Sequence, residues 1–313
     1  MKIYHQLPNA EPAYAAERAA HPLVVAIGFF DGFHIGHRAI VRELLRARRP
    51  GERAAVVTFR EHPAAFLRPG QEPPLIMTLE ERINSFARAG VDEAFVLRFD
   101  APLASLGPAA FLDETLVSKI GARAMIVGEN FRFGAKRAGD ASFAQAYLLE
   151  RGLRFVAVAN ELDGGERVSS TRVRAAIGAA DLATADRLLG ASYSVRGPVA
   201  LGYGRGHDLG FPTANIVVPQ QKLLPPDGVY AVTGRYEGRD YRGLVSIGSN
   251  PTFDGTHRTV EAWLLDFWGS LYGEELALRD FRFVRAQRRF ANVDGLQEQM
   301  RADAATVRFP SFL

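Results

Sequence analysis

Two histidines three positions apart, His34 and His37, stand in the segment AIGFFDGFHIGHR (residues 26–38). This spacing places both imidazoles on one face of a helix, where both can donate a hydrogen bond to the same phosphate. Gly36, between them, removes a side chain that would block the close approach of a nucleotide. A metal-binding pair and helix caps are the alternative interpretations, and this segment alone leaves them open.

Two later segments offer further phosphate-binding side chains. GENFRFGAKRAGD (128–140) follows a predicted strand and carries Asn130 and Arg132 in one loop. RVSSTRVR (167–174) places serine and threonine hydroxyls at the start of a predicted helix, followed by arginines. Hydroxyls that cap a helix and arginines in its first turns form a cradle for phosphate. Each segment alone is also explained as a basic loop or an N-cap.

A strand that leads into a helix must position these side chains. LVVAIGFF (23–30) is short and rich in β-branched and aromatic residues, which predicts a buried strand. Residues 37–49 have helical spacing of apolar residues. Ligands of open parallel sheets bind at the carboxyl ends of strands, and helix N-termini attract phosphate. Further strands are predicted at 54–59, 93–99, 122–130 and 153–159, and further helices at 78–90, 108–119 and 140–151. This alternation predicts an α/β fold with a doubly wound parallel sheet.

The pattern changes after about residue 185. Residues 167–190 read as helical, and five strand-like runs then follow without a helix between them. Glycine, proline and Asn-Pro turns separate these runs, which predicts an antiparallel barrel or sandwich. Residues 295–308 form a closing helix. We therefore expect two domains, residues 1–186 and 187–313.

The second domain has polar residues of its own. In GFPTANI (210–216), Thr213 offers a hydroxyl and Asn215 an amide carbonyl, and both are hard oxygen ligands suited to Mg²⁺. Glu261 lies in a strand-like run that is otherwise mostly apolar. Such a carboxylate is either a solvent-facing strand residue or a general base, and strand alternation alone favours the first.

The composition is that of an ordinary globular protein. Of the 313 residues 47% are hydrophobic and 23% charged, and the net charge is +3. This charge does not by itself indicate a nucleic-acid or membrane surface, although it suits anionic substrates. The chain has no cysteine, which excludes disulfides and thiolate metal sites and favours a reducing cytoplasm. The N-terminus lacks the apolar core of a signal peptide, and no apolar run reaches the ~20 residues of a membrane helix.

These motifs resemble a known family. HIGH followed downstream by SSTRVR (169–174) looks like the nucleotidylyltransferase superfamily; class I aminoacyl-tRNA synthetases also contain HIGH, but this chain has no KMSKS segment. PTAN (212–215), PPDGVY (225–230) and NPTF (250–253) resemble the riboflavin kinase module. From about residue 22 to 308 the chain is similar to prokaryotic bifunctional FAD synthetases, which join a riboflavin kinase to an FMN adenylyltransferase. The resemblance implies a Rossmann-like domain followed by an antiparallel β-barrel with a C-terminal helix.

The resemblance also implies roles in adenylyl transfer. His34 and His37 would stabilise the α-phosphate of ATP as the FMN phosphate attacks it, and Asn130 would help to hold the substrates. Residues implied to bind ATP or phosphate are Gly28, Phe29, Asp31, Gly36, Ser170, Thr171 and Arg174. Those implied to bind flavin are Phe59, His62, Pro63 and Arg132. In the family's usual flavin segment Asp-Pro stands where this chain has Arg60-Glu61.

For the kinase, the resemblance assigns Mg²⁺ and ATP phosphates to Thr213 and Asn215, and ATP also to Gly204 and Arg205. Glu261 would deprotonate the riboflavin 5′-hydroxyl. Three departures from the family pattern, Leu201, His207 and Ser246, put the kinase's substrate affinity in question. The expected small-molecule partners are riboflavin, FMN, FAD and ATP. The alternatives are an adenylyltransferase whose β domain only binds flavin, and a nucleotide sensor without catalysis.

Overall fold

The computed structural model describes residues 1–8, 11–200, 211–252 and 255–308. The chain forms two compact units, Met1–Ser170 and Thr171–Leu313, and each is described by itself. The domain boundary between residues 186 and 187 stays a prediction. The predicted ATP ligands Gly204 and Arg205, and the departures Leu201 and His207, lie outside the described residues.

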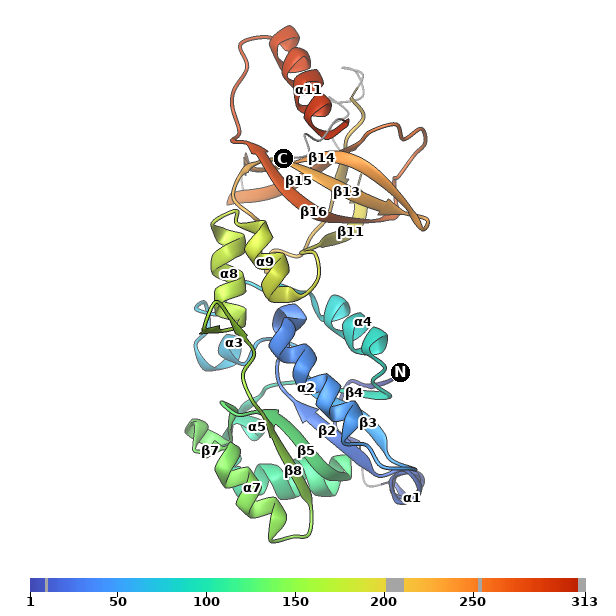
Figure 1. Ribbon diagram of the computed structural model, residues 1–313, viewed down its shortest axis with the longest axis vertical. Helices are drawn as coiled ribbons and strands as arrows, with labels where there is room; N and C mark the ends of the chain where they lie inside the picture. Colours follow the sequence, from blue (N-terminus) through green and yellow to red (C-terminus); the bar gives the residue numbers. More distant parts are fainter. Residues whose placement is uncertain (9–10, 201–210, 253–254, 309–313) are drawn as a thin grey trace. The chain divides into compact units, whose positions relative to one another are not determined.

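The first unit is built on a six-stranded sheet in the order β1-β4-β3-β2-β5-β8, in which all neighbours run parallel (Figure 1). The strands are β1 (Lys2–Tyr4), β2 (Leu23–Ile27), β3 (Arg53–Phe59), β4 (Glu93–Leu97), β5 (Ala122–Gly128) and β8 (Arg154–Val158). The predicted parallel α/β fold is therefore confirmed. The three-residue strand β1 was not predicted.

Helices cover both faces of this sheet, because alternate strand residues point to opposite sides. Val24 and Ala26 face α2 (Ile35–Arg46) and α4 (Leu79–Ala89), and Val25 and Ile27 belong to the core on the other face. That second core also contains residues of α7 (Ala141–Leu149) and of the π-helix η2 (Phe111–Ile120), which continues α6 (Pro108–Ala110). The shorter elements of this unit are α1 (Pro12–Ala20), η1 (Asp31–Phe33), α3 (Pro63–Leu67), α5 (Ala101–Ser105), β6 (Arg132–Phe133), η3 (Ala135–Arg137), β7 (Gly139–Asp140), β9 (Leu162–Asp163) and β10 (Glu166–Arg167).

A buried ion pair fixes the N-terminal helix α1 to the amino end of β4. Arg18 Nη2 donates to Glu93 Oε1 at 2.9 Å, and the two side chains are 7% and 1% exposed. Arg53 Nη1 reaches the same carboxylate oxygen at 3.1 Å. Arg18 Nη2 also reaches Glu17 at 3.2 Å, so a network of ion pairs ties α1 to the sheet.

The helical region predicted for residues 167–190 is two helices rather than one. α8 (Ser170–Gly178) ends at a glycine, and α9 (Leu182–Leu189) begins after Asp181. The Asp181 side chain accepts a hydrogen bond from the Thr184 N–H, which caps the second helix. Aspartate is favoured at an N-cap and disfavoured inside a helix, so Asp181 begins a new helix.

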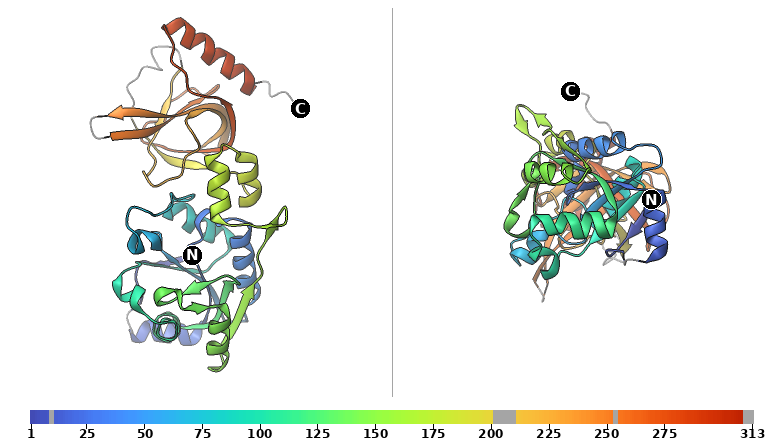
Figure 2. Two further views of the ribbon diagram at one scale, coloured as in Figure 1. Left: turned by 90° about the vertical axis from the view of Figure 1, so that its left-hand side faces the viewer. Right: turned by 90° about the horizontal axis from the view of Figure 1, so that it is seen from below.

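The second unit contains a closed barrel in the order β11-β12-β15-β14-β13-β16, with β16 pairing back to β11 (Figure 2, left). Its strands are β11 (Val195–Ala200), β12 (Ala214–Ile216), β13 (Gly228–Tyr236), β14 (Arg239–Thr252), β15 (Gly255–Leu264) and β16 (Glu275–Arg285). All pairs are antiparallel, so of the two predicted architectures the barrel is present. The short strand β12 was not predicted.

The predicted closing helix is α11 (Val293–Arg308). Ala304 and Val307 pack on a cluster of barrel residues that includes Val229 and Leu244. Arg285 of β16 forms an ion pair with the buried carboxylate of Asp303 at 2.8 Å, which fixes the helix to the barrel. Within the described residues, no helix is both long and apolar enough to cross a membrane.

Candidate active sites in the two units

The turn after β2 is held in an unusual backbone conformation. Phe30 and Phe33 have φ angles of 59° and 42°, which bulky residues seldom adopt. Both rings are buried and meet Phe86 of α4 edge to face, at centroid distances of 5.5 and 5.6 Å. Packing of these rings in the core therefore stabilises the strained backbone of the turn. Strained backbone of this kind clusters at functional sites.

The two histidines lie at the start of α2, as the sequence predicts. His34 is the N-cap, and its Nδ1 accepts a hydrogen bond from the His37 N–H at 3.3 Å. The two rings stack with centroids 3.6 Å apart and an angle of 16° between their planes. A Cβ at Gly36 would lie 3.2 Å from the His34 ring, so glycine at this position leaves the ring in place.

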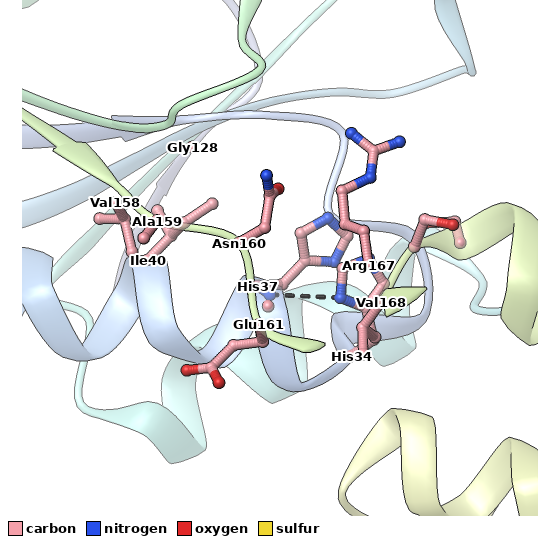
Figure 3. A pocket seen from close by; sticks show the side chains of 13 residues that line it. His34, His37, Ile40, Gly128, Val158, Ala159, Asn160, Glu161, Arg167 and Val168 are labelled. Atoms are coloured by element: carbon pink, nitrogen blue, oxygen red, sulfur yellow. Dashed lines mark hydrogen bonds between the residues drawn. The ribbon is translucent and has the colours of Figure 1, made fainter. Parts of the chain in front are cut away.

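These residues line a cavity of about 260 Å³ (Figure 3). Of the predicted site residues, His34, Gly36, His37 and Ser170 lie in its wall. The other lining residues are Ile40, Gly128, Val158, Ala159, Asn160, Glu161, Arg167, Val168 and Ser169. The wall thus combines the carboxyl ends of β5 and β8 with the start of α2, which is where open parallel sheets bind ligands.

Sequence reasoning missed the part of this wall that follows β8. The side chain and the backbone N–H of Asn160 both donate to the Glu129 carboxylate, which joins the ends of β8 and β5. Glu161 pairs with Arg42 of α2 at 3.5 Å. The sequence signal that could have found Asn160 and Glu161 was their position directly after a predicted strand. The carboxyl ends of neighbouring parallel strands meet at one edge of a sheet, so residues at these ends lie close together.

The cavity wall keeps His37 uncharged. Its Nδ1 atom is buried and has no hydrogen-bond partner among the described residues. Burial, followed by the neighbouring His34 and Arg82, lowers the pKa of His37 well below its usual value of 6.5. At neutral pH His37 is therefore a neutral imidazole, which can donate one hydrogen bond to a phosphate oxygen.

Asp31 has structural hydrogen bonds in this turn. Its carboxylate accepts the backbone N–H groups of Ile76 and Met77 at 3.1 and 2.9 Å, and its carbonyl accepts the Ser170 hydroxyl at 2.9 Å. The role of Asp31 in ATP binding stays a prediction, as do those of Gly28 and Phe29. Thr171 and Arg174 belong to α8 of the second unit, and their roles also stay predictions.

Aromatic side chains gather at the ends of β3 and β4. Phe59 and Phe66 both meet Phe99 edge to face, at 5.5 and 6.0 Å, and Phe66 is 44% exposed. His62 caps α3 through its Nδ1 and packs against Phe29 at 4.6 Å. Such a partly exposed aromatic group suits a flat ring, in keeping with the predicted flavin side.

Two further residues predicted to bind flavin, Pro63 and Arg132, and the predicted catalytic residue Asn130 are not among the residues that line the cavity. Pro63 opens α3. Arg132 of β6 pairs with Asp140 at 2.6 Å and closes the β6–β7 hairpin. Asn130 is exposed. The predicted roles of Pro63, Arg132 and Asn130 are not tested by this geometry.

In the barrel, Asn215 of β12 lies directly opposite Glu261 of β15. On the other side of Glu261 the opposite residue is Ser246 of β14, so the three side chains form a row across three strands. Directly opposite residues point to the same face of a sheet, with Cβ atoms about 5 Å apart. All three are partly buried, and the Ser246 Oγ accepts a hydrogen bond from Gln287 at 2.7 Å. The sequence alone could not show that Asn215 and Glu261 are neighbours.

The second unit also contains a cavity of about 230 Å³, and Asn215, Glu261 and Ser246 are not among the residues that line it. Thr213 lies in its wall together with Ala262 of β15 and the segment between β15 and β16. That segment contributes Phe267, Gly269, Ser270, Leu271 and Tyr272. The wall combines aromatic rings with the Thr213 hydroxyl, so it can accept a ligand that has both an apolar ring and a polar group.

The cavity beside the two histidines of the α/β unit and the row of Asn215, Glu261 and Ser246 in the barrel fit a two-domain transferase that uses a nucleotide. Two family models agree: FAD synthetase matches residues 16–172, and riboflavin kinase matches residues 189–309. The chain belongs to the family of bifunctional riboflavin kinase/FMN adenylyltransferases.

Similar proteins cover almost the whole chain. The bifunctional riboflavin kinase/FMN adenylyltransferase of Listeria monocytogenes is 36% identical and covers 91% of both chains. That of Pseudomonas fluorescens is also 36% identical, over 98% of this chain and 97% of its own. A crystal structure from Streptococcus pneumoniae, described as a macrolide-efflux protein, has a TM-score of 0.84 and 31% identity and covers 98% of this chain and 99% of its own.

Proposed function

We propose that this chain makes FAD in two steps: riboflavin and ATP give FMN, and FMN and a second ATP give FAD and pyrophosphate. The first step takes place on the barrel and the second in the α/β unit. The observation that carries the proposal is the register that places Glu261 opposite Asn215. A barrel that only bound flavin would need no carboxylate at this position.

For the kinase step, Glu261 would accept the proton of the riboflavin 5′-hydroxyl as its oxygen attacks the γ-phosphate. A positioned general base of this kind typically contributes about 10²–10⁴ in rate. The oxygens of Thr213 and Asn215 fit Mg²⁺, which in such sites keeps few protein ligands and binds substrate phosphates. When bound, Mg²⁺ would neutralise phosphate charge. In the described part of the chain, no group of three His, Cys, Asp or Glu could hold a metal ion.

For adenylyl transfer, the phosphate of FMN attacks the α-phosphorus of ATP, and the bond to the pyrophosphate group breaks. His34 and His37 would donate hydrogen bonds to the α-phosphate oxygens, where negative charge increases. Ser170, Thr171 and Arg174 would hold the leaving pyrophosphate. The neutral state of His37 supports this role. A charged imidazole in the cavity would need a carboxylate partner, whereas an uncharged imidazole can donate to a phosphate oxygen without one. ATP as co-substrate supports a cytoplasmic location, which stays a prediction.

Chromatography of the flavins formed from riboflavin, ATP and Mg²⁺ tests the proposal. Wild-type protein should give FMN and then FAD. His37→Ala should stop FAD formation and leave FMN formation intact, and Glu261→Gln should stop FMN formation but still adenylylate added FMN. The controls are His5→Ala and Glu275→Gln, at exposed positions of the two units. A product mixture that contained only riboflavin would refute the proposal, and parallel loss of both activities would refute the division into two sites.

A further inference from the structure

Arg82 lies on α4, and its side chain is completely buried. Its Nη1 donates to the Phe29 carbonyl at 2.8 Å and to the Thr58 hydroxyl at 3.0 Å. Its Nη2 donates to the carbonyls of Phe59 at 3.0 Å and Arg60 at 3.2 Å. The guanidinium also lies over the Phe29 ring, 4.1 Å from the centroid. All four acceptors are uncharged, which is unusual for a buried cation.

Burial disfavours the charge of Arg82. Burial lowers the pKa of Arg82 to about 10, and the charges of Asp31 and Glu61 oppose the shift, so the side chain stays charged at neutral pH. A buried charge is costly unless it is well paired, and apolar side chains of similar volume often pack with equal or greater stability. A cation kept at such a position therefore points to a role in the site.

The acceptors of Arg82 belong to the two segments that form the predicted substrate sites. Phe29 follows β2 and leads through the strained turn to His34. Phe59 ends β3 and leads to His62 of the aromatic group. The rigid guanidinium, with donors at both ends, bridges the segment on the ATP side and the segment on the flavin side.

A second contact holds the turn after β2, which contains Asp31. The N–H groups of Ile76 and Met77, in the segment before α4, donate to the Asp31 carboxylate. A capping box of Thr78 and Glu81 fixes the start of the same helix. The turn and the end of β3 are thus attached to one rigid element, and their separation cannot change unless these hydrogen bonds break.

We propose that Arg82 is a positioning residue for adenylyl transfer: it fixes the end of β2 relative to the end of β3, so that the FMN phosphate meets the ATP α-phosphate in line. This inference rests on the proposed function of the α/β unit. Arg82 touches neither substrate and acts through the backbone of Phe29, Phe59 and Arg60.

The test compares Arg82→Lys with wild type and with Arg88→Lys, an exposed position on the same helix. Lysine has a single donor atom in place of the planar fork and shifts its pKa readily when buried, so it cannot reproduce the four hydrogen bonds of Arg82 to the two segments. Displacing reacting groups by about 1 Å costs on the order of 10²-fold. Arg82→Lys should therefore lower kcat for FAD formation from FMN by about 10–100-fold and change both KM values less than about 3-fold. Thr58→Val, which removes one acceptor and keeps the shape, should act in the same direction with a smaller effect.

Hydrogen exchange of the same variants gives a readout that does not depend on activity. The amides of residues 28–34 and 58–62 should exchange faster in Arg82→Lys, and those of β5 and α7 should not. Faster exchange throughout the unit, or unchanged kcat with unchanged exchange, would overturn the positioning role. If wild-type protein formed no FAD, the proposed function would fail, and the exchange data would still decide whether Arg82 holds the two strand ends.

Discussion

Replacing His37 by glutamine should remove a specific part of the acid sensitivity of the first unit. The pKa of His37 is well below 6.5 in the folded protein, mainly because of burial. The unfolded chain therefore binds a proton at mildly acidic pH that the native state does not bind, and the stability that neutral His37 supports is lost as the pH falls below the unfolded pKa. One unit below an unfolded pKa of about 6.5, the loss amounts to at most about 1.4 kcal/mol; at pH 7.5 it is negligible.

Urea unfolding at pH 7.5 and 5.5 measures this loss. Both tryptophans, Trp263 and Trp268, lie in the second unit, so their fluorescence follows that unit, whereas far-UV circular dichroism follows both. Between the two pH values wild type should lose more stability than His37→Gln, by up to about 1.4 kcal/mol, in the transition that fluorescence does not follow. His5→Gln, at an exposed position, should behave as wild type. Equal acid sensitivity in wild type and His37→Gln would show that His37 protonates normally in the folded protein, and would refute the neutral-donor argument.

Two further substitutions test the structure around the site. Glu93→Gln leaves the buried Arg18 with Glu17, at 3.2 Å, as its remaining carboxylate partner, and should destabilise the first unit by about 1–3 kcal/mol in the same urea assay; a change below about 1 kcal/mol would mean that Glu17 compensates Arg18 fully. Gly134→Ala places a Cβ 2.9 Å from the backbone of Pro108 at a φ of +72°, whereas Gly152→Ala, at φ +68°, meets nothing within 4 Å. Both should show backbone strain of about 1 kcal/mol, and only Gly134→Ala an added clash of about 1–3 kcal/mol; equal losses in thermal unfolding would contradict this.

The elements that the sequence predicts well are those whose pattern is local. The capping box at Thr78 and Glu81 is present, because it needs only residues three positions apart. The strands β2 to β5 are mostly apolar, as expected for a sheet that is covered on both faces. By contrast, β1 has three residues, and its pairing with β4 depends on a neighbour about ninety residues away along the chain. Such a contact leaves no local pattern.

The same distinction separates the predicted and the missed parts of the site. His34, Gly36 and His37 lie in one motif, and the structure places them together in one cavity wall. Asn160 reaches that wall only because β8 lies next to β5, an adjacency that the strand order determines. Arg82 was missed for another reason: in sequence it looks like a solvated residue of an amphipathic helix, and only the tertiary fold buries it.

The two proposed sites contain different residues because the two molecules that accept the transferred groups, riboflavin and FMN, differ in charge. A riboflavin hydroxyl is neutral and must lose a proton as it attacks, which is why the proposal for the barrel includes a base, Glu261. The phosphate of FMN is already an anion and needs no base; it needs hydrogen-bond donors that stabilise charge on the α-phosphate. The first cavity accordingly has stacked histidines in its wall, and its carboxylate Glu161 is paired with Arg42. An unpaired carboxylate in this cavity would repel the two anionic substrates, ATP and FMN. The proposed chemistry therefore explains why the described wall contains no unpaired carboxylate.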